Sequence, residues 1–183
     1  LDALHEAGAR GVRLNLLFAG GGRGVADAEA FAPRLAERGR HIQLLVNAAD
    51  RTLPWSTLGR LPCDLVFDHM GHLDAALGLD DPGFQALLAL ARDGRAWVKL
   101  SGAMRLSRYP EPPHPDVVPL ARALVQAAPT RLVWGSDWPH VKLPHPHMPN
   151  DGTLLDLLAD WVPDPIRRRR ILVDNPSALY GGG

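Results

Sequence analysis

Five short runs of apolar residues recur along the chain, and each is followed by a loop and then by a helical pattern. The runs are GVRLNLLF (11–18), HIQLLVN (41–47), DLVFDHM (64–70), AWVKLSG (96–102) and RLVWGSD (131–137). Their near-continuous apolar character, with many β-branched and aromatic residues, is typical of strands buried on both faces of a sheet. We therefore expect five buried strands.

The segments between these runs carry the boundary signals of helices. Aspartate followed by proline at the first helical position, and glycine just beyond the last one, mark helix ends. They predict helices over 26–38, 82–94, 116–128, 153–161 and from 165 onward, with a short turn at 54–60. Pro33 weakens the expectation of an unbroken first helix. The chain also opens on a helical pattern with Leu1, Leu4 and Ala7 on one face.

The alternation of strands and helices predicts an α/β fold with a parallel sheet. Two architectures fit this order of elements. One is an open doubly wound sheet, and the other is part of a (β/α)8 barrel, which typically needs about 250 residues. The chain has 183 residues, from which we expect a single domain over 1–183.

Composition narrows the classes of partner. Lysine and arginine total 20 and aspartate and glutamate total 20, so the formal net charge is zero. We therefore expect no nucleic acid and no anionic membrane as partner. The basic run Arg167–Arg170 is interpreted as a solvated helix face. Cys63 is the only cysteine, which excludes an intrachain disulfide and favours a reducing, cytoplasmic location.

Polar side chains follow every one of the five apolar runs. In parallel architectures, chemistry collects at the carboxyl ends of the strands, so these residues are expected to meet at one rim. They are Arg13, Asn15, Gln43, Asn47, Asp68, His69, His72, Lys99, Ser101, Arg105, Asp137 and His140. This convergence of polar groups is the functional signal.

Several of these residues also have a purely structural interpretation when taken alone. Arg13 could be an ion-paired residue of the barrel, and His69 could be a hydrogen-bonded histidine of the core. Asp137 could cap a turn, and Lys99 could extend its ammonium group to solvent. Five successive strands that all end in polar groups make a functional rim the better hypothesis.

Two motifs are set aside as loops. The glycine run at 20–24 lacks the GxGxxG spacing that opens directly into a helix in dinucleotide-binding folds. His145-Pro146-His147 has the HxH pattern of a metal site, but it lies among prolines, where a central strand cannot form.

The motifs GARGVRLNL, DHMGH, VKLSG, GSDWPH and DNPSALY, in this order, resemble the amidohydrolase-related family of the amidohydrolase superfamily. The lactonases of the 2-pyrone-4,6-dicarboxylate lactonase type are the members that they resemble most. This resemblance implies a (β/α)8 TIM barrel in which the five strands here are strands four to eight. It also implies that the first three strands are absent from this sequence, which begins inside a helix without an initiator methionine.

The resemblance implies roles for the residues that match the family motifs. Asp137 would be the acid/base group that activates water, and His69 would polarise the substrate or bind a metal. If one divalent ion is bound, the resemblance implies zinc, with His69 and Asp137 as ligands. Asn47 stands where two-metal members carry a histidine, so the resemblance favours either no metal or a single ion.

The same resemblance implies a set of substrate-binding residues. Arg13 and Arg105 match arginines that bind a substrate carboxylate, and His140 is implied to be an active-site imidazole. Two positions depart from the pyrone-dicarboxylate pattern, because His72 replaces an arginine and Leu45 replaces a tyrosine. Both departures argue against the pyrone dicarboxylate itself as the substrate.

The resulting hypothesis is a hydrolase that opens the lactone ring of a small carboxylated molecule. Asp137 would be the base for water, strengthened if Trp134 and Trp138 shield it from solvent. One alternative is a metal-dependent decarboxylase of the same family. The other is a non-catalytic barrel fragment or an incomplete gene model, which would need a homo-oligomer or another partner to cover the open strand edges.

Overall fold

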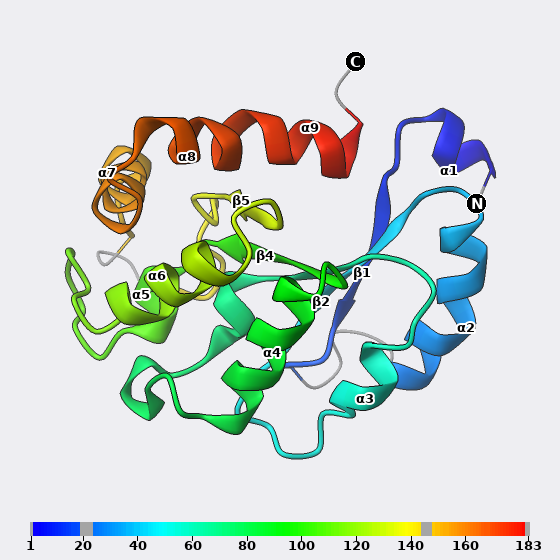
Figure 1. Ribbon diagram of the computed structural model, residues 1–183, viewed down its shortest axis with the longest axis horizontal. Helices are drawn as coiled ribbons and strands as arrows, with labels where there is room; N and C mark the ends of the chain where they lie inside the picture. Colours follow the sequence, from blue (N-terminus) through cyan, green and yellow to red (C-terminus); the bar gives the residue numbers. More distant parts are fainter. Residues whose placement is uncertain (1, 19–23, 144–147, 182–183) are drawn as a thin grey trace.

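The computed structural model describes residues 2–18, 24–143 and 148–181 and shows one parallel sheet flanked by helices (Figure 1). The strands are β1 (Gly11–Asn15), β2 (His41–Leu45), β3 (Leu65–Phe67), β4 (Ala96–Leu100) and β5 (Leu132–Trp134). They pair in the order β1-β2-β3-β4-β5, so each strand lies beside its neighbour in sequence. This unreversed parallel order agrees with βα units of a (β/α)8 barrel, whereas a doubly wound sheet reverses its strand order.

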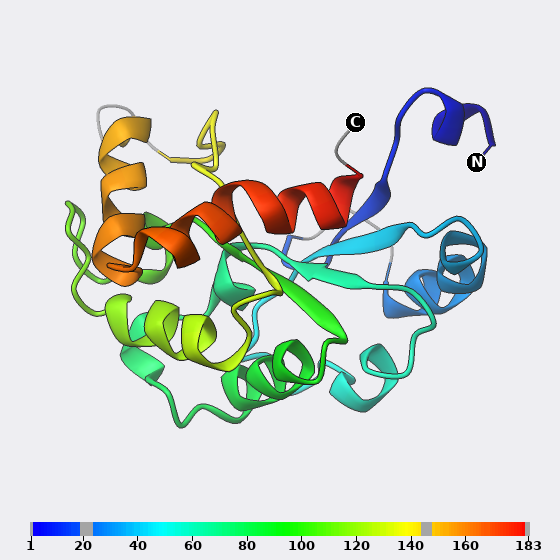
Figure 2. The same ribbon diagram turned by 45° about the horizontal axis from the view of Figure 1, so that its top comes forward.

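Most helices lie between successive strands and cover one face of the sheet, whereas the last helix packs against the other face (Figures 1 and 2). They are α1 (Asp2–Glu6), α2 (Val25–Ala36), α3 (Trp55–Leu58), α4 (Pro82–Arg92), α5 (Ala103–Leu106), α6 (Val118–Ala127), α7 (Asp151–Trp161), α8 (Pro165–Arg169) and α9 (Asn175–Tyr180). A π-helical turn (Arg170–Asp174) joins α8 to α9, so that Figure 1 shows them as one rod. Within the described residues, no helix is both long and apolar enough to cross a membrane.

The two faces of the sheet differ in chemistry. Side chains alternate along each strand, so Leu14, Leu44 and Phe67 point to the helices and form part of the main core. On the other face, Arg13 is in register with Gln43. Lys99 is in register with Val133 on this same face. This second face therefore carries polar groups that lead up to the carboxyl ends of the strands.

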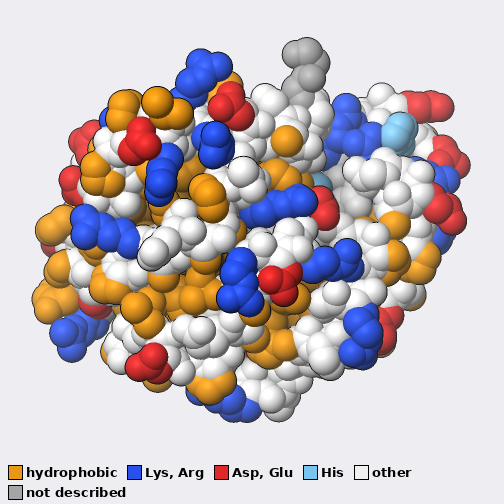
Figure 3. All heavy atoms as spheres, viewed as in Figure 1, with side chains coloured by type: hydrophobic (Ala, Val, Ile, Leu, Met, Phe, Trp, Pro, Cys, Tyr) orange, Lys and Arg blue, Asp and Glu red, His pale blue; other side chains and the backbone are white. Residues whose placement is uncertain are grey.

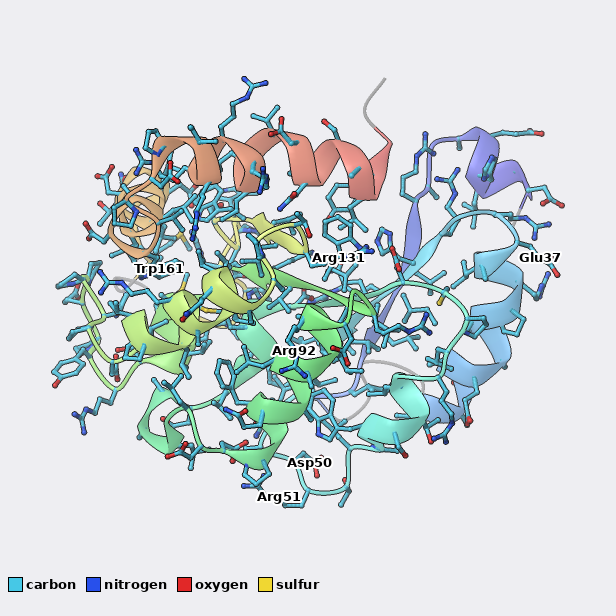
Figure 4. All side chains as sticks on the ribbon, in the orientation of Figure 1. Glu37, Asp50, Arg51, Arg92, Arg131 and Trp161 are labelled. Atoms are coloured by element: carbon cyan, nitrogen blue, oxygen red, sulfur yellow. The ribbon has the colours of Figure 1, made fainter. Side chains whose placement is uncertain are left out.

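A small apolar cluster closes the amino-terminal part of that second face. Val66, Trp97 and Val133 pack together, and Leu179 of α9 packs against them. The guanidinium group of Arg131, which is labelled in Figure 4, lies 4.8 Å from the centroid of the Trp97 ring. Apolar side chains therefore cover this end of the sheet, and the polar side chains lie at the opposite, carboxyl end.

The strands and helices are confirmed, but the strands are shorter than the apolar runs that predicted them. The run 11–18 forms a strand only to Asn15, and the run 131–137 only over Leu132–Trp134. The remaining residues of these runs enter loops at the carboxyl edge. Helix α2 passes through Pro33 without a break and ends three residues later, at Ala36.

Helix starts follow their capping groups. Asp81 caps α4 as expected, because its side chain accepts hydrogen bonds from the backbone N–H groups of Gly83 and Phe84. Helix α7 starts earlier than predicted, since the Asn150 side chain accepts from the N–H groups of Gly152 and Thr153. The sequence pattern had assigned the start to the residues after the Asp-Gly pair.

Three further expectations can be compared with the structure. Helix α1 forms, but Leu4 on its apolar face is 59% exposed, so this face is not buried within the described chain. The basic run lies at the end of α8 and in the following turn, and Arg167 and Arg169 are exposed, as expected of a solvated face. The glycine run at 20–23 and the HxH motif at 145–147 lie outside the described residues.

One asparagine ties the last helix to the sheet. Asn175 is buried, and its side-chain amide donates to the backbone carbonyl oxygens of Pro129 and Leu132, at 3.0 and 2.7 Å. The DNPSALY motif therefore has a structural role in holding α9 beside β5.

We expect Asn175→Ala to lower the free energy of unfolding by roughly 1–3 kcal/mol, because the buried carbonyl group of Leu132 and the partly buried one of Pro129 lose their donor. Ser177→Ala, at an exposed position of the same helix, is the matched control and should change it little. Urea denaturation of both variants measures the difference. Equal stability of the two would contradict the structural role of Asn175.

Candidate active site

A cavity of about 350 Å³ opens at the carboxyl edge of the sheet. Its walls come from β1 itself, from the segments that follow β1, β3, β4 and β5, and from the last residue of β2. The lining residues are Arg13, Asn15, Phe18, Leu45, His69, His72, Arg105, Asp137, Trp138, Pro139, Val141 and Lys142. Five residues predicted for the site, Arg13, His69, His72, Arg105 and Asp137, therefore meet in one cavity.

His69 is held rigidly between two partners. Its Nδ1 atom lies 2.9 Å from the Ser101 hydroxyl, and its Nε2 atom lies 3.3 Å from Asp137 Oδ1. Behind the ring, Gly102 adopts a φ of +67°, and a Cβ atom there would come within 2.7 Å of His69 Nδ1. The glycine of the VKLSG motif therefore makes room for the imidazole, and the serine fixes its orientation.

The environment of His69 keeps its imidazole neutral at pH 7. Burial lowers its pKa to about 4 and outweighs the nearby carboxylates of Asp137 and Asp68, which act in the opposite direction. A neutral imidazole carries one proton, and the Ser101 hydroxyl can donate to Nδ1 or accept from it. With Ser101 as donor, the ring proton stays on Nε2 and faces Asp137.

Asp137 is oriented by Arg105. The Arg105 Nε group donates to Asp137 Oδ2 at 2.6 Å, and one of its terminal nitrogens donates to the carbonyl oxygen of Val141 at 2.9 Å. The Asp137 side chain is 15% exposed, but this shielding does not come from the tryptophan that follows it. Trp138 is 72% exposed, which corrects the expectation that its ring covers the carboxylate.

A second carboxylate, Asp68, lies buried beside the cavity. It accepts from Arg13 Nε at 3.0 Å, from the Gln43 amide at 2.9 Å and from the Lys99 ammonium at 3.0 Å. Burial alone would raise the pKa of Asp68, but the charge of Lys99 and the hydrogen bond from Gln43 lower it. Asp68 therefore holds Arg13 at the wall of the cavity, and Lys99 is paired within this face of the sheet.

The structure does not bring His140 to the cavity. Its side chain is 1% exposed, and its Nε2 atom lies 3.0 Å from Asp151 Oδ1 at the start of α7. Its backbone N–H donates to the carbonyl oxygen of Asp137. His140 thus anchors the loop that carries Asp137, and the expected contact between His140 and substrate is replaced by a structural role. His72 does line the cavity, with its ring centroid 6.0 Å from that of His69.

The sequence did not indicate that Lys142 and Phe18 would meet at the cavity wall. Lys142 places its Nζ atom over the Phe18 ring, 3.6 Å from the centroid. Lys142 follows GSDWPH by two residues and adopts a positive φ of 67°, and Phe18 ends the first apolar run. The proximity of Lys142 to the last motif was the available signal, but the direction of its side chain depends on the loop conformation.

The described residues do not form a metal site by themselves. His69 and Asp137 supply two donor atoms, whereas a catalytic zinc ion usually has three protein ligands. No group of three or more histidine, cysteine, aspartate or glutamate side chains within the described residues could hold an ion. Arg105 also occupies the second oxygen of Asp137.

Comparison with known proteins gives one consistent family. The model of the family described as Amidohydrolase matches residues 1–182. A 4-sulfomuconolactone hydrolase of Hydrogenophaga intermedia is 50% identical over 129 residues, covering 68% of this chain and 41% of that protein. A 2-pyrone-4,6-dicarboxylate hydrolase of Comamonas testosteroni is 36% identical, covering 98% of this chain and 62% of that protein. The chain thus spans less than two thirds of each.

Solved structures agree with the fold. A crystal structure from Agrobacterium tumefaciens superposes with a TM-score of 0.88 at 30% identity, covering 100% of this chain and 65% of that one. A Burkholderia multivorans amidohydrolase described with bound zinc superposes with a TM-score of 0.67 at 22% identity, covering 99% of this chain and 69% of that one. The five βα units are therefore part of a TIM-barrel fold of the (β/α)8 type.

The buried neutral state of His69 predicts a loss of stability in acid. Between pH 6.5 and pH 4 the unfolded chain binds a proton on this imidazole and the folded chain does not, so acid favours unfolding. By pH 4 this single group lowers the free energy of unfolding by about 3 kcal/mol. Denaturation measured from pH 7 to pH 4 should show a smaller decrease in the free energy of unfolding for His69→Gln than for the unsubstituted protein.

The loss will be reduced in this variant and not abolished, because burial also lowers the pKa of His41, His72 and His114. Gln126→Ala, at an exposed position of α6 and without a titrating group, is the control and should keep the original slope. An unchanged slope in His69→Gln would show that the folded protein accepts a proton on this ring.

Proposed function

Because this chain belongs to the amidohydrolase family, we propose that it forms the catalytic edge of a hydrolase that opens the lactone ring of a small carboxylated molecule. The observation that carries this proposal is the position of Asp137, whose two oxygens face His69 Nε2 and Arg105 Nε at the wall of one cavity. A carboxylate beside a neutral imidazole supplies a proton acceptor and a hydrogen-bond donor together. The relatives whose names specify lactone hydrolysis support the same chemistry.

The reaction divides between these two residues. Asp137 accepts a proton from water as the water oxygen adds to the lactone carbonyl carbon. The Nε2–H group of His69 donates to the carbonyl oxygen as negative charge develops on it. The ring C–O bond then breaks, and Asp137 returns the proton to the departing oxygen. Ser101 acts through His69, because its hydroxyl bonded to Nδ1 keeps the proton on Nε2.

Substrate recognition uses the cations around these groups. Arg13 lines the cavity, is held by Asp68, and presents its remaining donors to a substrate carboxylate. Arg105 contributes to the same wall, although two of its nitrogens are engaged by Asp137 and Val141. His72 and Leu45 give this wall a different shape and charge from the arginine and tyrosine of the pyrone-dicarboxylate pattern. The preferred lactone would accordingly differ from the pyrone dicarboxylate.

A divalent ion, zinc by preference, would take His69 and Asp137 as two of its ligands. It would require further ligands from outside the described residues, and it would supply polarisation of the carbonyl oxygen.

We expect Asp137→Asn to lower kcat by at least about 100-fold, because the amide cannot accept the proton from water. Activity is measured as the conversion of carboxylated lactones to ring-opened acids by mass spectrometry. Hydrolysis adds the mass of one water, whereas isomerisation of the lactone leaves the mass unchanged. Asp93→Asn, at the exposed end of α4, is the matched control and should keep full activity.

Circular dichroism and thermal melting of Asp137→Asn separate a chemical defect from misfolding. Turnover at the original rate in a folded Asp137→Asn protein would defeat the assignment of the base. A product of unchanged mass would replace hydrolysis by isomerisation.

A further inference from the structure

The three cations that line the cavity differ in how far they are neutralised. Arg13 shares its Nε and one terminal nitrogen with the Asp68 carboxylate, at 3.0 and 2.9 Å. Arg105 is bonded through Nε to the Asp137 carboxylate at 2.6 Å. The Lys142 ammonium lies against an aromatic ring, and no described carboxylate forms an ion pair with it. Lys142 is therefore the wall cation whose charge is left uncompensated by the described residues.

The contact with Phe18 orients this charge without cancelling it. A cation over an aromatic face is attracted to the negative region of the ring, and the ring itself carries no net charge. Phe18 comes from the segment after β1 and Lys142 from the loop after β5, so the pair closes across the mouth of the cavity. Phe18 is 38% exposed, and Lys142 is exposed as well, so an incoming molecule can reach the ammonium group.

We propose that Lys142 is a specificity-determining residue that binds a second anionic group of the substrate, held over Phe18 at the mouth of the cavity. This inference rests on the proposed function, in which Arg13 serves the first carboxylate and His69 and Asp137 serve the ring carbonyl. The second group is an oxyanion, either a carboxylate or a sulfonate, since both accept hydrogen bonds from an ammonium group. The preferred substrates are therefore lactones with two negative charges.

The test compares two lactones that differ only in the second anionic group. The measured quantity is the ratio of kcat/KM for the doubly charged lactone to that for the singly charged lactone. Lys142→Met should lower this ratio by about 10- to 100-fold, as expected for the loss of a hydrogen bond between charged groups. The loss should appear in KM, because the contact is made equally in the ground state and the transition state. Lys142→Arg should restore most of the ratio.

A matched control removes a similar pair outside the cavity. Arg108 lies over the Tyr109 ring, 5.3 Å from its centroid, and neither residue lines the cavity. Arg108→Met should leave the ratio unchanged. A ratio that stays the same in Lys142→Met, or that falls equally in Arg108→Met, would overturn the inference. Carboxylated and sulfonated versions of the second group, measured in parallel, identify which oxyanion Lys142 binds better.

A binding measurement separates this inference from the proposed function. Calorimetric titration with succinate and with butyrate should show a preference for the dianion in the unsubstituted protein and its loss in Lys142→Met. If this preference depends on Lys142 but no lactone is hydrolysed, the anion site stands and the proposed function fails. If lactones are hydrolysed but Lys142→Met changes neither the preference nor the ratio, the function stands and the inference fails.

Discussion

The site depends on the burial of one carboxylate, Asp68, at the end of β3. A buried charge is unfavourable unless donors surround it, and here the donors come from three other strands: Arg13 on β1, Gln43 on β2 and Lys99 on β4. These contacts hold the carboxyl ends of four neighbouring strands in fixed positions relative to one another. They also set Arg13 in the cavity wall and leave the adjacent residue, His69, facing Asp137.

Much of the fold could be predicted from the sequence, because its strands are buried and its helices carry local caps. The five apolar runs gave five strands in parallel order, and Asp81 capped its helix as its position before proline indicated. Strand ends were less predictable. The runs continue into loop residues such as Phe18, whose apolar side chain lines the cavity and does not belong to a strand. Similarly, helix α7 starts directly after its capping residue, Asn150, and therefore includes the Asp-Gly pair that was expected to precede it.

The candidate site was predictable to the extent that strand geometry determines it. Residues at strand ends, such as Arg13 and His69, were placed together because parallel strands bring their carboxyl ends to one edge. Residues further into the loops were placed only in part: Arg105 and Asp137 reach the cavity, whereas His140 does not. The direction of such side chains depends on backbone turns that sequence periodicity does not encode. Asp137 and His140 both have positive φ values, and this turn sends His140 away from the cavity and Trp138 into solvent.

Arg105 contacts both the base and the loop next to it. One guanidinium group binds the Asp137 carboxylate and also the carbonyl oxygen of Val141, the residue next to Lys142. Arg105 therefore links the base, Asp137, to the loop that carries Lys142. Changes that move the backbone of this loop at Val141 would therefore alter the alignment of the base as well. Such backbone changes, unlike an exchange of the Lys142 side chain alone, should change turnover and selectivity together.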